Sequence, residues 1–297
     1  MGMTGGNVVV VGSVNADLVL SMDTLPQPGE TLAATGIENL IGGKGANQAT
    51  AAARLGASVQ FVGRTGLDEP GERARRTLAA AGVGIDHVVA ESSVPTGQAI
   101  VMVDGSGENS IVVVGGANAA MTAADVQRAA EVIAAADVVV CQLEVPQAVV
   151  AAAFAAAQGT TILNAAPAST VSPEVLARTD VLVVNEIEYG MLGGDATFGS
   201  DSADLPATVV LTLGGTGARV LARGADPVDV SAPRVEVVDT TGAGDTFVGA
   251  LAEALARGES TEAAVRRAVA AGAVSVGALG ATVGMPTADQ VDALLDD

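Results

Sequence analysis

The sequence has almost no lysine, few aromatic residues and one cysteine, and these shortages exclude particular kinds of core, covalent link and partner. Aromatic residues make up 2% of the 297 residues and tryptophan is absent, so the core must consist of many small aliphatic contacts. The single cysteine, Cys141, excludes an internal disulfide and favours a reducing, cytoplasmic location. No basic region followed by a long apolar run opens the chain, so we expect no signal peptide.

Positive charge is also scarce, with 14 Lys and Arg against 34 Asp and Glu and a net charge of −20. Nucleic acids and anionic membranes are bound through basic surfaces, so neither is expected as a partner. The most apolar stretch, 145–157, is too short to span a membrane and contains Pro146, which predicts a soluble protein. If such an acidic chain binds phosphate, it must supply directed backbone N–H groups or bound cations.

Aliphatic residues are abundant, because the hydrophobic fraction is 49%, and this excludes a disordered chain. Strand-like apolar runs alternate with helix-like segments, which predicts a mainly parallel sheet covered by helices on both faces. The expected helices are 47–55, 71–81, 123–136, 146–158, 244–257, 261–277 and 287–295, and strands are expected at 57–63, 137–143, 161–165, 181–184 and 208–213.

Three half-polar segments, 15–22, 32–41 and 97–115, read as strands that have no helix between them. We interpret them as a small separate sheet. It would form a lid over the carboxyl edge of the main sheet, where open α/β folds bind ligands. The chain 1–297 would otherwise form a single domain.

The segment VDTTGAGDTFVGAL at 238–251 has the strongest chemical signal. A strand ends near Val238 and a Gly-rich turn leads into a helix, so the unpaired N–H groups of the first helical turn can bind an anion. Asp245 follows that turn and could accept a proton from a hydroxyl that attacks a bound phosphate. It could equally be an ordinary N-cap residue.

The segment GGKGANQA at 42–49 contains the only lysine of the chain, Lys44, between glycines that allow a ligand to approach the backbone. Lys44 and Asn47 would donate hydrogen bonds to that ligand. The alternative is an ordinary turn that leads into a helix capped by Asn47. The spacing is not that of a P-loop, which needs four residues before Gly-Lys and then Ser or Thr.

Asn15 and Asp17, in GSVNADL, follow a buried strand and share one face if the chain stays extended; the alternative is an Asx turn, which this segment by itself favours. Glu144 follows another apolar strand. The string NEIE offers Asn185 and Glu188, which could act on a hydrated Mg²⁺ or simply begin a helix. The Gly-rich loop 212–218 suits nucleotide phosphates or a hairpin turn, and it lacks the G-x-G-x-x-G spacing of a dinucleotide site.

In this order, GSVNADL, GGKGANQA, QLE, NEIE, TLGGTG and DTTGAGDTF resemble the ribokinase branch of the PfkB carbohydrate kinase family over essentially the whole chain. The resemblance implies a ribokinase-like three-layer α/β sandwich and the ATP-dependent phosphorylation of a primary hydroxyl of a small sugar, with D-ribose as the first choice. The implied sugar-binding residues are Asn15, Asp17, Gly43, Lys44, Asn47, Glu144 and Asp245. Asp245 would be the catalytic base, and the anion hole would consist of Gly242, Ala243 and Gly244. The implied ATP contacts are Asn185, Thr212, Gly214, Gly215, Gly217 and Gly244.

The resemblance also implies Mg²⁺, which Glu188 would hold through water, and a monovalent cation, usually K⁺. The matching positions for that cation are Asp239, Thr241, Ser275, Ala278, Gly280 and Gly284. Gly284 stands where a serine is frequent in the family, so we expect weaker K⁺ binding and expect Gly284→Ser to strengthen it. Val269 stands near the implied adenine pocket, where Asn or His is common, which leaves the nucleotide preference open.

Other acceptors remain open, namely deoxyribose, fructose, tagatose or a nucleoside. A nucleobase would favour an aromatic partner, and the proposed lid segments contain none. A sugar-binding regulator without activity is a further alternative, disfavoured by Asp245 beside an intact Gly-Ala-Gly. His87 and Cys141 lack a catalytic partner and are interpreted as structural. By resemblance, the protein is expected to be a homodimer joined through its lid.

Overall fold

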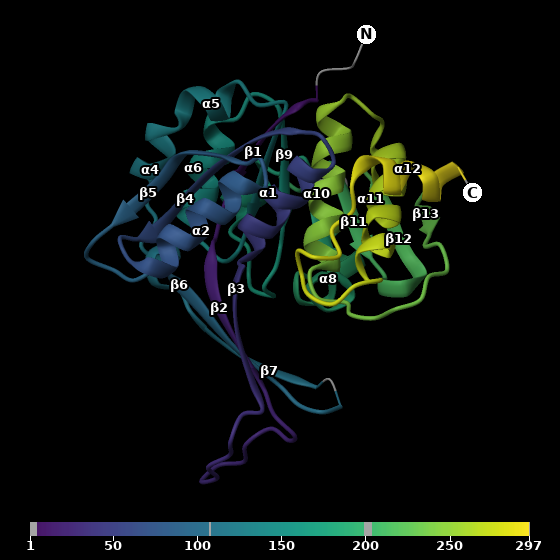
Figure 1. Cartoon of the computed structure of the whole chain (residues 1–297). Coiled ribbons are helices and arrows are strands. Elements are labelled where there is room, and N and C mark those ends of the chain that lie inside the picture. Colours follow the sequence, from purple (N-terminus) through teal and green to yellow (C-terminus); the bar gives the residue numbers. More distant parts are fainter. Residues whose placement is uncertain (1–4, 107, 199–203, 297) are drawn as a thin grey trace.

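The computed structural model describes residues 5–106, 108–198 and 204–296, and its main feature is a nine-stranded sheet between two layers of helices (Figure 1). The strand order is β13-β12-β11-β10-β9-β8-β1-β4-β5, in which β12 and β13 are antiparallel to their neighbours and all other pairs are parallel. The strands are β1 Asn7–Val11, β4 Ser58–Gly66, β5 Gly84–Glu91, β8 Val138–Gln142, β9 Thr160–Asn164, β10 Val181–Asn185, β11 Thr208–Thr212, β12 Gly217–Ala222 and β13 Val228–Ser231.

Each face of the sheet packs against its own set of helices, and β1 shows how. Its run of valines is buried throughout, with Val8 and Val10 in one core cluster and Val9 and Val11 in the other, as the two-residue period of a strand requires. The first cluster is covered by α1 Lys44–Arg54, α2 Glu69–Ala80, α10 Ala243–Ala256, α11 Thr261–Ser275 and α12 Ala288–Asp296. The second is covered by α4 Ala123–Arg128, α5 Ala130–Ala134, α6 Gln147–Ala156, α7 Pro173–Leu176 and α8 Glu186–Met191. The short helices α3 Gly116–Ala119 and α9 Gly194–Phe198 lie in connections.

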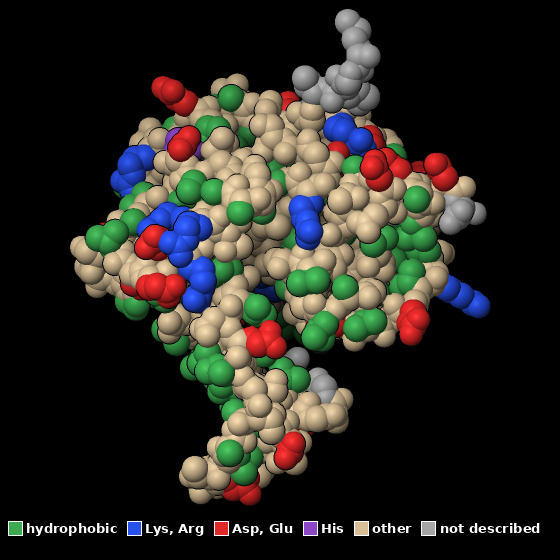
Figure 2. Space-filling model, in the orientation of Figure 1, with side chains coloured by type: hydrophobic (Ala, Val, Ile, Leu, Met, Phe, Trp, Pro, Cys, Tyr) green, Lys and Arg blue, Asp and Glu red, His purple; other side chains and the backbone are tan. Residues whose placement is uncertain are grey.

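A separate four-stranded sheet projects from this body (Figure 1). Its order is β3-β2-β6-β7, and β2 pairs in parallel with β6 while the outer pairs are antiparallel. The strands are β2 Asn15–Ser21, β3 Gly36–Gly42, β6 Gly97–Val103 and β7 Asn109–Val114. Hydrophobic side chains remain exposed on this sheet, among them Ile37 and the run 111–114, and Figure 2 shows such side chains gathered on the projecting part.

The expected fold class, a mainly parallel α/β sheet with a smaller separate sheet, is confirmed. Several elements differ from the sequence predictions. The strand expected to end near Val238 is wrong, because residues 232–238 form neither helix nor strand. The strand expected at 32–41 begins only at Gly36, and the helix expected at 123–136 is interrupted at Ala129, whose φ is −102° and ψ is 10°. The edge strands β5 and β13, and β12 beside β13, were not predicted, because they are partly exposed and lack a continuous apolar run. Over the residues described, no helix is long and apolar enough to cross a membrane.

Candidate active site

The Gly-rich turn before α10 forms an open helix N-terminus. Gly242 is the N-cap residue with φ 75°, and a Cβ at this position would lie 2.8 Å from the Ala281 backbone, so both the conformation and the space require glycine. A Cβ at Gly244 would meet no atom within 4 Å, so space is open in front of the first turn. The first N–H groups of a helix have no partner within the helix. Ala243 N donates to Thr240 O at 3.2 Å, outside the helix, and the helix dipole makes the start of α10 suitable for an anion.

Asp245 is the third residue of α10 and its carboxylate is held from the side by α1. Its Oδ2 accepts a hydrogen bond from Asn47 Nδ2 at 2.9 Å, and its Oδ1 accepts one from Gln48 Nε2 at 3.0 Å. The N-cap alternative for Asp245 is therefore wrong, because Gly242 occupies that position. Burial raises the pKa of Asp245, while the Lys44 charge and the two amide donors act in the opposite direction.

The start of α1 is fixed by Glu144, which follows β8. Glu144 Oε2 accepts hydrogen bonds from Lys44 N at 3.0 Å and from Ser13 Oγ at 2.5 Å. Gly43 is the N-cap with φ 90°, and Asn47 donates to Asp245 instead of capping the helix, so that alternative is also wrong. Lys44 is the first residue of α1. Its charge lowers the pKa of Asp245, whereas the charge of Glu144 raises it, in the same direction as burial.

Asn15 and Asp17 are the first and third residues of β2, so they lie on one face of a strand and the Asx-turn alternative is wrong. Asn118 Nδ2 donates to Asn15 Oδ1 at 2.7 Å. Asp17 Oδ1 is buried and accepts no hydrogen bond from the described residues. Burial, helped by the nearby Glu144 charge, raises the pKa of Asp17 to about 6. A buried acceptor of this kind is suited to a hydroxyl donor from a ligand.

Asn185 and Glu188 form a capping box at the start of α8. Asn185 Oδ1 accepts from Glu188 N at 2.8 Å, and Glu188 Oε2 accepts from Asn185 N at 2.9 Å. Glu188 is buried rather than solvated; burial raises its pKa, and the Lys44 charge opposes that shift. Thr212 pairs with Asn185 across β10 and β11, and the turn Gly214–Thr216 then joins β11 to antiparallel β12, as expected for a hairpin.

These groups converge on a cleft of about 180 Å³ at the carboxyl ends of the strands. Its lining is Lys44, Asn164, Ala166, Val183, Val184, Asn185, Glu188, Thr212, Gly242, Gly244, Asp245 and Val248. The expected base, the anion-binding turn and part of the expected nucleotide set therefore share one space. The turn 214–216 and the residues Asn15 and Asp17 are not part of this lining.

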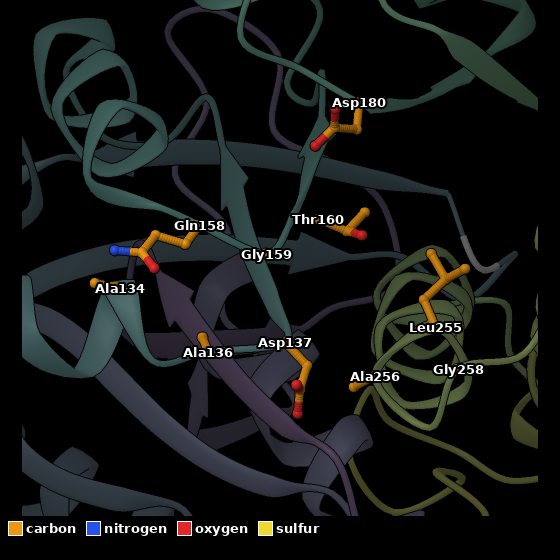
Figure 3. Close-up of a pocket in the computed structure, with 10 residues that line it drawn as sticks. All are labelled: Ala134, Ala136, Asp137, Gln158, Gly159, Thr160, Asp180, Leu255, Ala256 and Gly258. Carbon is orange, nitrogen blue, oxygen red and sulfur yellow. The ribbon is translucent and has the colours of Figure 1, made fainter.

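A larger hollow of about 590 Å³ lies at the opposite end of the sheet, where β8 and β9 begin (Figure 3). Its two carboxylates accept hydrogen bonds from backbone N–H groups. Asp137 Oδ2 accepts from Asn7 N at 2.8 Å, and Asp180 Oδ2 accepts from Thr161 N at 2.8 Å. It contains none of the predicted site residues. The smaller cleft is the better candidate, since it combines charge, open N–H groups and a buried base.

The segments expected to hold a monovalent cation lie together. Asp239 Oδ1 accepts from Thr241 N at 2.9 Å, and Asp239 Oδ2 accepts from Gly280 N at 2.8 Å, which joins 239–241 to the loop that contains Ala278 and Gly280. Ser275 Oγ donates to Gly272 O at 2.8 Å, within its own helix. Carboxylate, hydroxyl and carbonyl oxygens, the ligands that hard cations prefer, therefore lie on two neighbouring loops.

Two further positions, Gly284 and Val269, were singled out in the sequence because they differ from residues common in the family. A Cβ at Gly284 would overlap the Ser275 carbonyl oxygen, so this backbone does not accommodate a serine and the expected benefit of Gly284→Ser is wrong. Val269 is buried within the core cluster on α11. In the part of the chain that the structure describes, no group of three or more His, Cys, Asp or Glu side chains could hold a metal ion by itself.

Several buried polar residues of the site were missed by sequence reasoning. Ser13 and Gln48 lie inside motifs that were recognised, and Gln142 belongs to the string QLE, but their types carry no catalytic signal. Asn118 and Asn164 lie outside every motif. The signal that identifies them is burial with directed hydrogen bonds, which only the folded chain shows.

A three-layered α/β fold with an anion-binding helix start, and a buried carboxylate beside it, defines a small-molecule phosphotransferase. The family model described as "pfkB family carbohydrate kinase" matches residues 6–288. The chain belongs to the pfkB family of carbohydrate kinases, and the family predicted from the motifs is confirmed.

Similar proteins support this assignment over the full length. A ribokinase of Bacillus subtilis is 41% identical over 292 residues, which is 97% of this chain and 99% of that protein. A crystal structure of ribokinase from Thermotoga maritima has a TM-score of 0.90 at 31% identity, covering 98% of this chain and 100% of that one. The structure of Arabidopsis thaliana ribokinase complexed with ribose and ATP has a TM-score of 0.90 at 35% identity, covering 99% of both chains.

Proposed function

We propose that this carbohydrate kinase transfers the γ-phosphoryl group of ATP to the primary hydroxyl of D-ribose, giving D-ribose 5-phosphate. The observation that carries the proposal is the buried carboxylate of Asp245, held by Asn47 and Gln48 beside the open N-terminus of α10. The ribokinases with which the chain shares its length and fold support the choice of ribose.

In the proposed mechanism Asp245 accepts the proton of the sugar hydroxyl as that oxygen attacks the phosphorus in line. The two amide donors orient the carboxylate and leave it in the charged form that a base requires. The N–H groups of residues 242–244 stabilise the negative charge on the transferring group. Burial raises the pKa of Asp245 and thereby makes the carboxylate a stronger base.

The sugar would lie between β2 and the start of α1. Asp17 Oδ1, which has no donor among the described residues, would accept a sugar hydroxyl, and Asn15 would contact another. The remaining proposed sugar contacts are Gly43, Lys44, Asn47 and Glu144. Each lies on α1 or directly against it, so one helix start would serve both the sugar and the base.

ATP would occupy the cleft on the other side of α10, against Asn185 and Thr212 and near the turn that carries Gly214, Gly215 and Gly217. Glu188 would contact a hydrated Mg²⁺ through water, and the ion would neutralise phosphate charge. The buried position of Glu188 in the lining fits that role. Lys44 influences the pKa of both Glu188 and Asp245, so it lies between the two proposed substrate sites.

A monovalent cation, K⁺ by preference, would be held by Asp239, Thr241 and backbone carbonyls of the loop with Ala278, Gly280 and Gly284. The positive charge would support the adjacent turn at 242–244 in this acidic protein. Asp239 already links the two loops through Thr241 and Gly280, which favours a preformed site.

A coupled assay of ADP release tests the whole proposal. The purified protein is tested with ribose, deoxyribose, fructose, tagatose and adenosine, each with K⁺ and with Na⁺. We expect ribose to give the highest kcat/KM, and K⁺ to activate more than Na⁺. A higher kcat/KM with another acceptor would replace ribose in the proposal. Absence of ADP release with every acceptor would contradict catalysis and favour a sugar-binding regulator. Full activity without K⁺, unchanged on its addition, would contradict the cation site.

A further inference from the structure

Behind Asp245 lies a row of buried amide side chains, of which the proposed mechanism uses only Gln48. Gln48 Nε2 donates to Asn164 Oδ1 at 3.0 Å as well as to Asp245 Oδ1 at 3.0 Å. Gln142 Nε2 donates to Gln48 Oε1 at 2.7 Å. Gln48 and Gln142 are both fully buried, and Gln142 is the last residue of β8. The row therefore connects the carboxylate on α10 to the central sheet.

The chemistry of these groups fixes the direction of every hydrogen bond. An ionised carboxylate only accepts, so Gln48 must present its NH₂ group to Asp245. Its two hydrogens then serve Asp245 and Asn164, and its oxygen points away and needs a donor. Gln142 Nε2 is that donor. If the Gln48 amide rotated by half a turn, its oxygen would face the Asp245 carboxylate and repel it.

This arrangement leaves one acceptor without a partner. Gln142 Oε1 is buried, accepts no hydrogen bond from the described residues and lies against Gly12, where any Cβ would overlap it. A buried unpaired oxygen destabilises a fold. The opposite orientation of the Gln142 amide would place its oxygen against Gln48 Oε1 and disturb the whole row. The unpaired oxygen is thus the consequence of keeping the Gln142 NH₂ group directed at Gln48.

We propose that Gln48 is a positioning residue for Asp245 and that Gln142 holds the Gln48 amide in its donor orientation. The inference rests on the proposed function only in taking Asp245 as the base. Because a hydrogen bond to the ionised carboxylate stabilises it, the row opposes the rise in the pKa of Asp245 that burial causes. Gln48 would act through Asp245 and would touch neither substrate.

Other charged groups lie near the Asp245 carboxylate, and their influence on its pKa must be distinguished from that of Gln48. Lys44 on α1 lowers the pKa of Asp245, and Glu144 after β8 raises it. Glu188 on α8 faces Lys44, and Asp17 on β2, with a pKa of about 6, is coupled to Glu144. Asp17 could therefore itself produce an acidic limb in a pH profile, and the titration of Asp245 has to be observed directly.

The first test replaces Gln48 by Met, which keeps the length of the side chain and removes the donor. In the ligand-free protein with ¹³C-labelled aspartate, the carboxyl signal that disappears in Asp245→Asn reports Asp245 alone. We expect Gln48→Met to raise its pKa by about one unit, and the acidic limb of kcat/KM to move by the same amount. Asp17 should titrate as before. Gln60→Met is the matched control, since Gln60 in β4 also has a buried, unpaired Oε1 but lies outside the row.

The second test uses Gln142→Met, alone and combined with Gln48→Met. Alone it should raise the pKa of Asp245 by a smaller amount, because Gln48 remains but loses its fixed orientation. In the Gln48→Met background it should cause no further shift, since Gln142 acts only through Gln48. An unchanged Asp245 titration in folded Gln48→Met would overturn the proposal, and so would equal shifts by Gln142→Met in both backgrounds. The NMR titration needs no turnover, so a failure of the proposed kinase activity would leave this result interpretable.

Discussion

At the scale of single residues, Asp245 is buried and yet has to be charged to act as a base. Asp245→Asn keeps the shape of the side chain and one of its two acceptor oxygens but removes the proton acceptor. We expect kcat to fall by about 10² to 10⁴ and the binding of ribose to change by no more than a few-fold, because only the transition state needs the base. Steady-state kinetics and calorimetric titration with ribose measure the two quantities.

A control for this variant is Asp229→Asn, which neutralises an exposed carboxylate paired with Arg219 on β12 and should retain full activity. Near-normal turnover of Asp245→Asn would remove Asp245 from the mechanism. An equal loss of ribose affinity and kcat would indicate a role in binding the sugar instead of accepting its proton.

Asp17, a proposed sugar contact, also affects the free energy of unfolding of the protein. Its pKa in the folded protein is about 6, against an ordinary value of 3.8. The folded chain therefore binds more protons than the unfolded chain between these values, so the cost of burying the ionised carboxylate is fully present above about pH 6 and disappears below about pH 4. Asp17→Asn should raise the free energy of unfolding by about 3 kcal/mol at neutral pH and change it little at about pH 4.

Urea unfolding at the two pH values measures this difference, and the same variant should bind ribose less tightly than the wild type. A loss of stability at neutral pH would contradict the argument, because it would mean that the ionised Asp17 stabilises the fold. Unchanged ribose affinity would show that Asp17 Oδ1 does not accept a sugar hydroxyl.

At the scale of elements, the start of α10 depends on the left-handed conformation of Gly242. Gly242→Ala introduces both strain and a contact with the Ala281 backbone, where a Cβ would lie at 2.8 Å. We expect the first turn of α10 to shift and kcat to fall by about ten- to a hundredfold, together with a lower melting temperature. Gly190→Ala on α8 is the matched control, because Gly190 has ordinary φ and free space around it.

Most of this architecture could be predicted because buried strands and helices leave apolar runs of different length in the sequence. The valine run of β1 and the small residues of α10 are buried on all sides, and their lengths distinguish strand from helix. Edge strands such as β5, which contains His87, give no comparable signal, since one of their faces is exposed to solvent. The break at Ala129 was also not predictable, because alanine favours a helix and nothing in the local sequence marks an interruption there.

The site could be predicted only in part, for a related physical reason. Charged residues and glycines in Gly-rich turns identify Lys44 and Asp245, since few other roles require them. Whether Asn47 caps a helix or holds a carboxylate depends on an atom 198 positions away in the chain. The same applies to Gln48, whose partner on β8 is visible only after folding.

At the scale of the whole molecule, the projecting sheet β3-β2-β6-β7 exposes more apolar surface than a soluble monomer usually leaves open. Ile111, Val112 and Val113 are each more than half exposed. We therefore expect a homodimer joined through this sheet. Light scattering at micromolar concentration should give the dimer mass, and Val112→Asp should reduce it to that of a monomer, because each subunit would bring a charge into the interface.

The control is Leu67→Asp, which adds the same charge at an exposed leucine between β4 and α2 and should leave the dimer intact. A monomeric wild type in the presence of ribose would contradict this assembly. Dissociation of both variants would point to net charge rather than to the projecting sheet, since the chain already carries a charge of −20.

The hydrogen bond between Asn47 and Asp245 joins residues 198 positions apart, and this has a consequence for how the enzyme is made. The sheet and most helices can form from nearer neighbours, but no competent site exists until α10 docks on α1. Such long-range docking is the slower event in folding. After dilution from denaturant, enzymatic activity should therefore return later than the helical circular dichroism signal. Recovery of both at the same rate would show that the two halves of the chain fold as one cooperative unit.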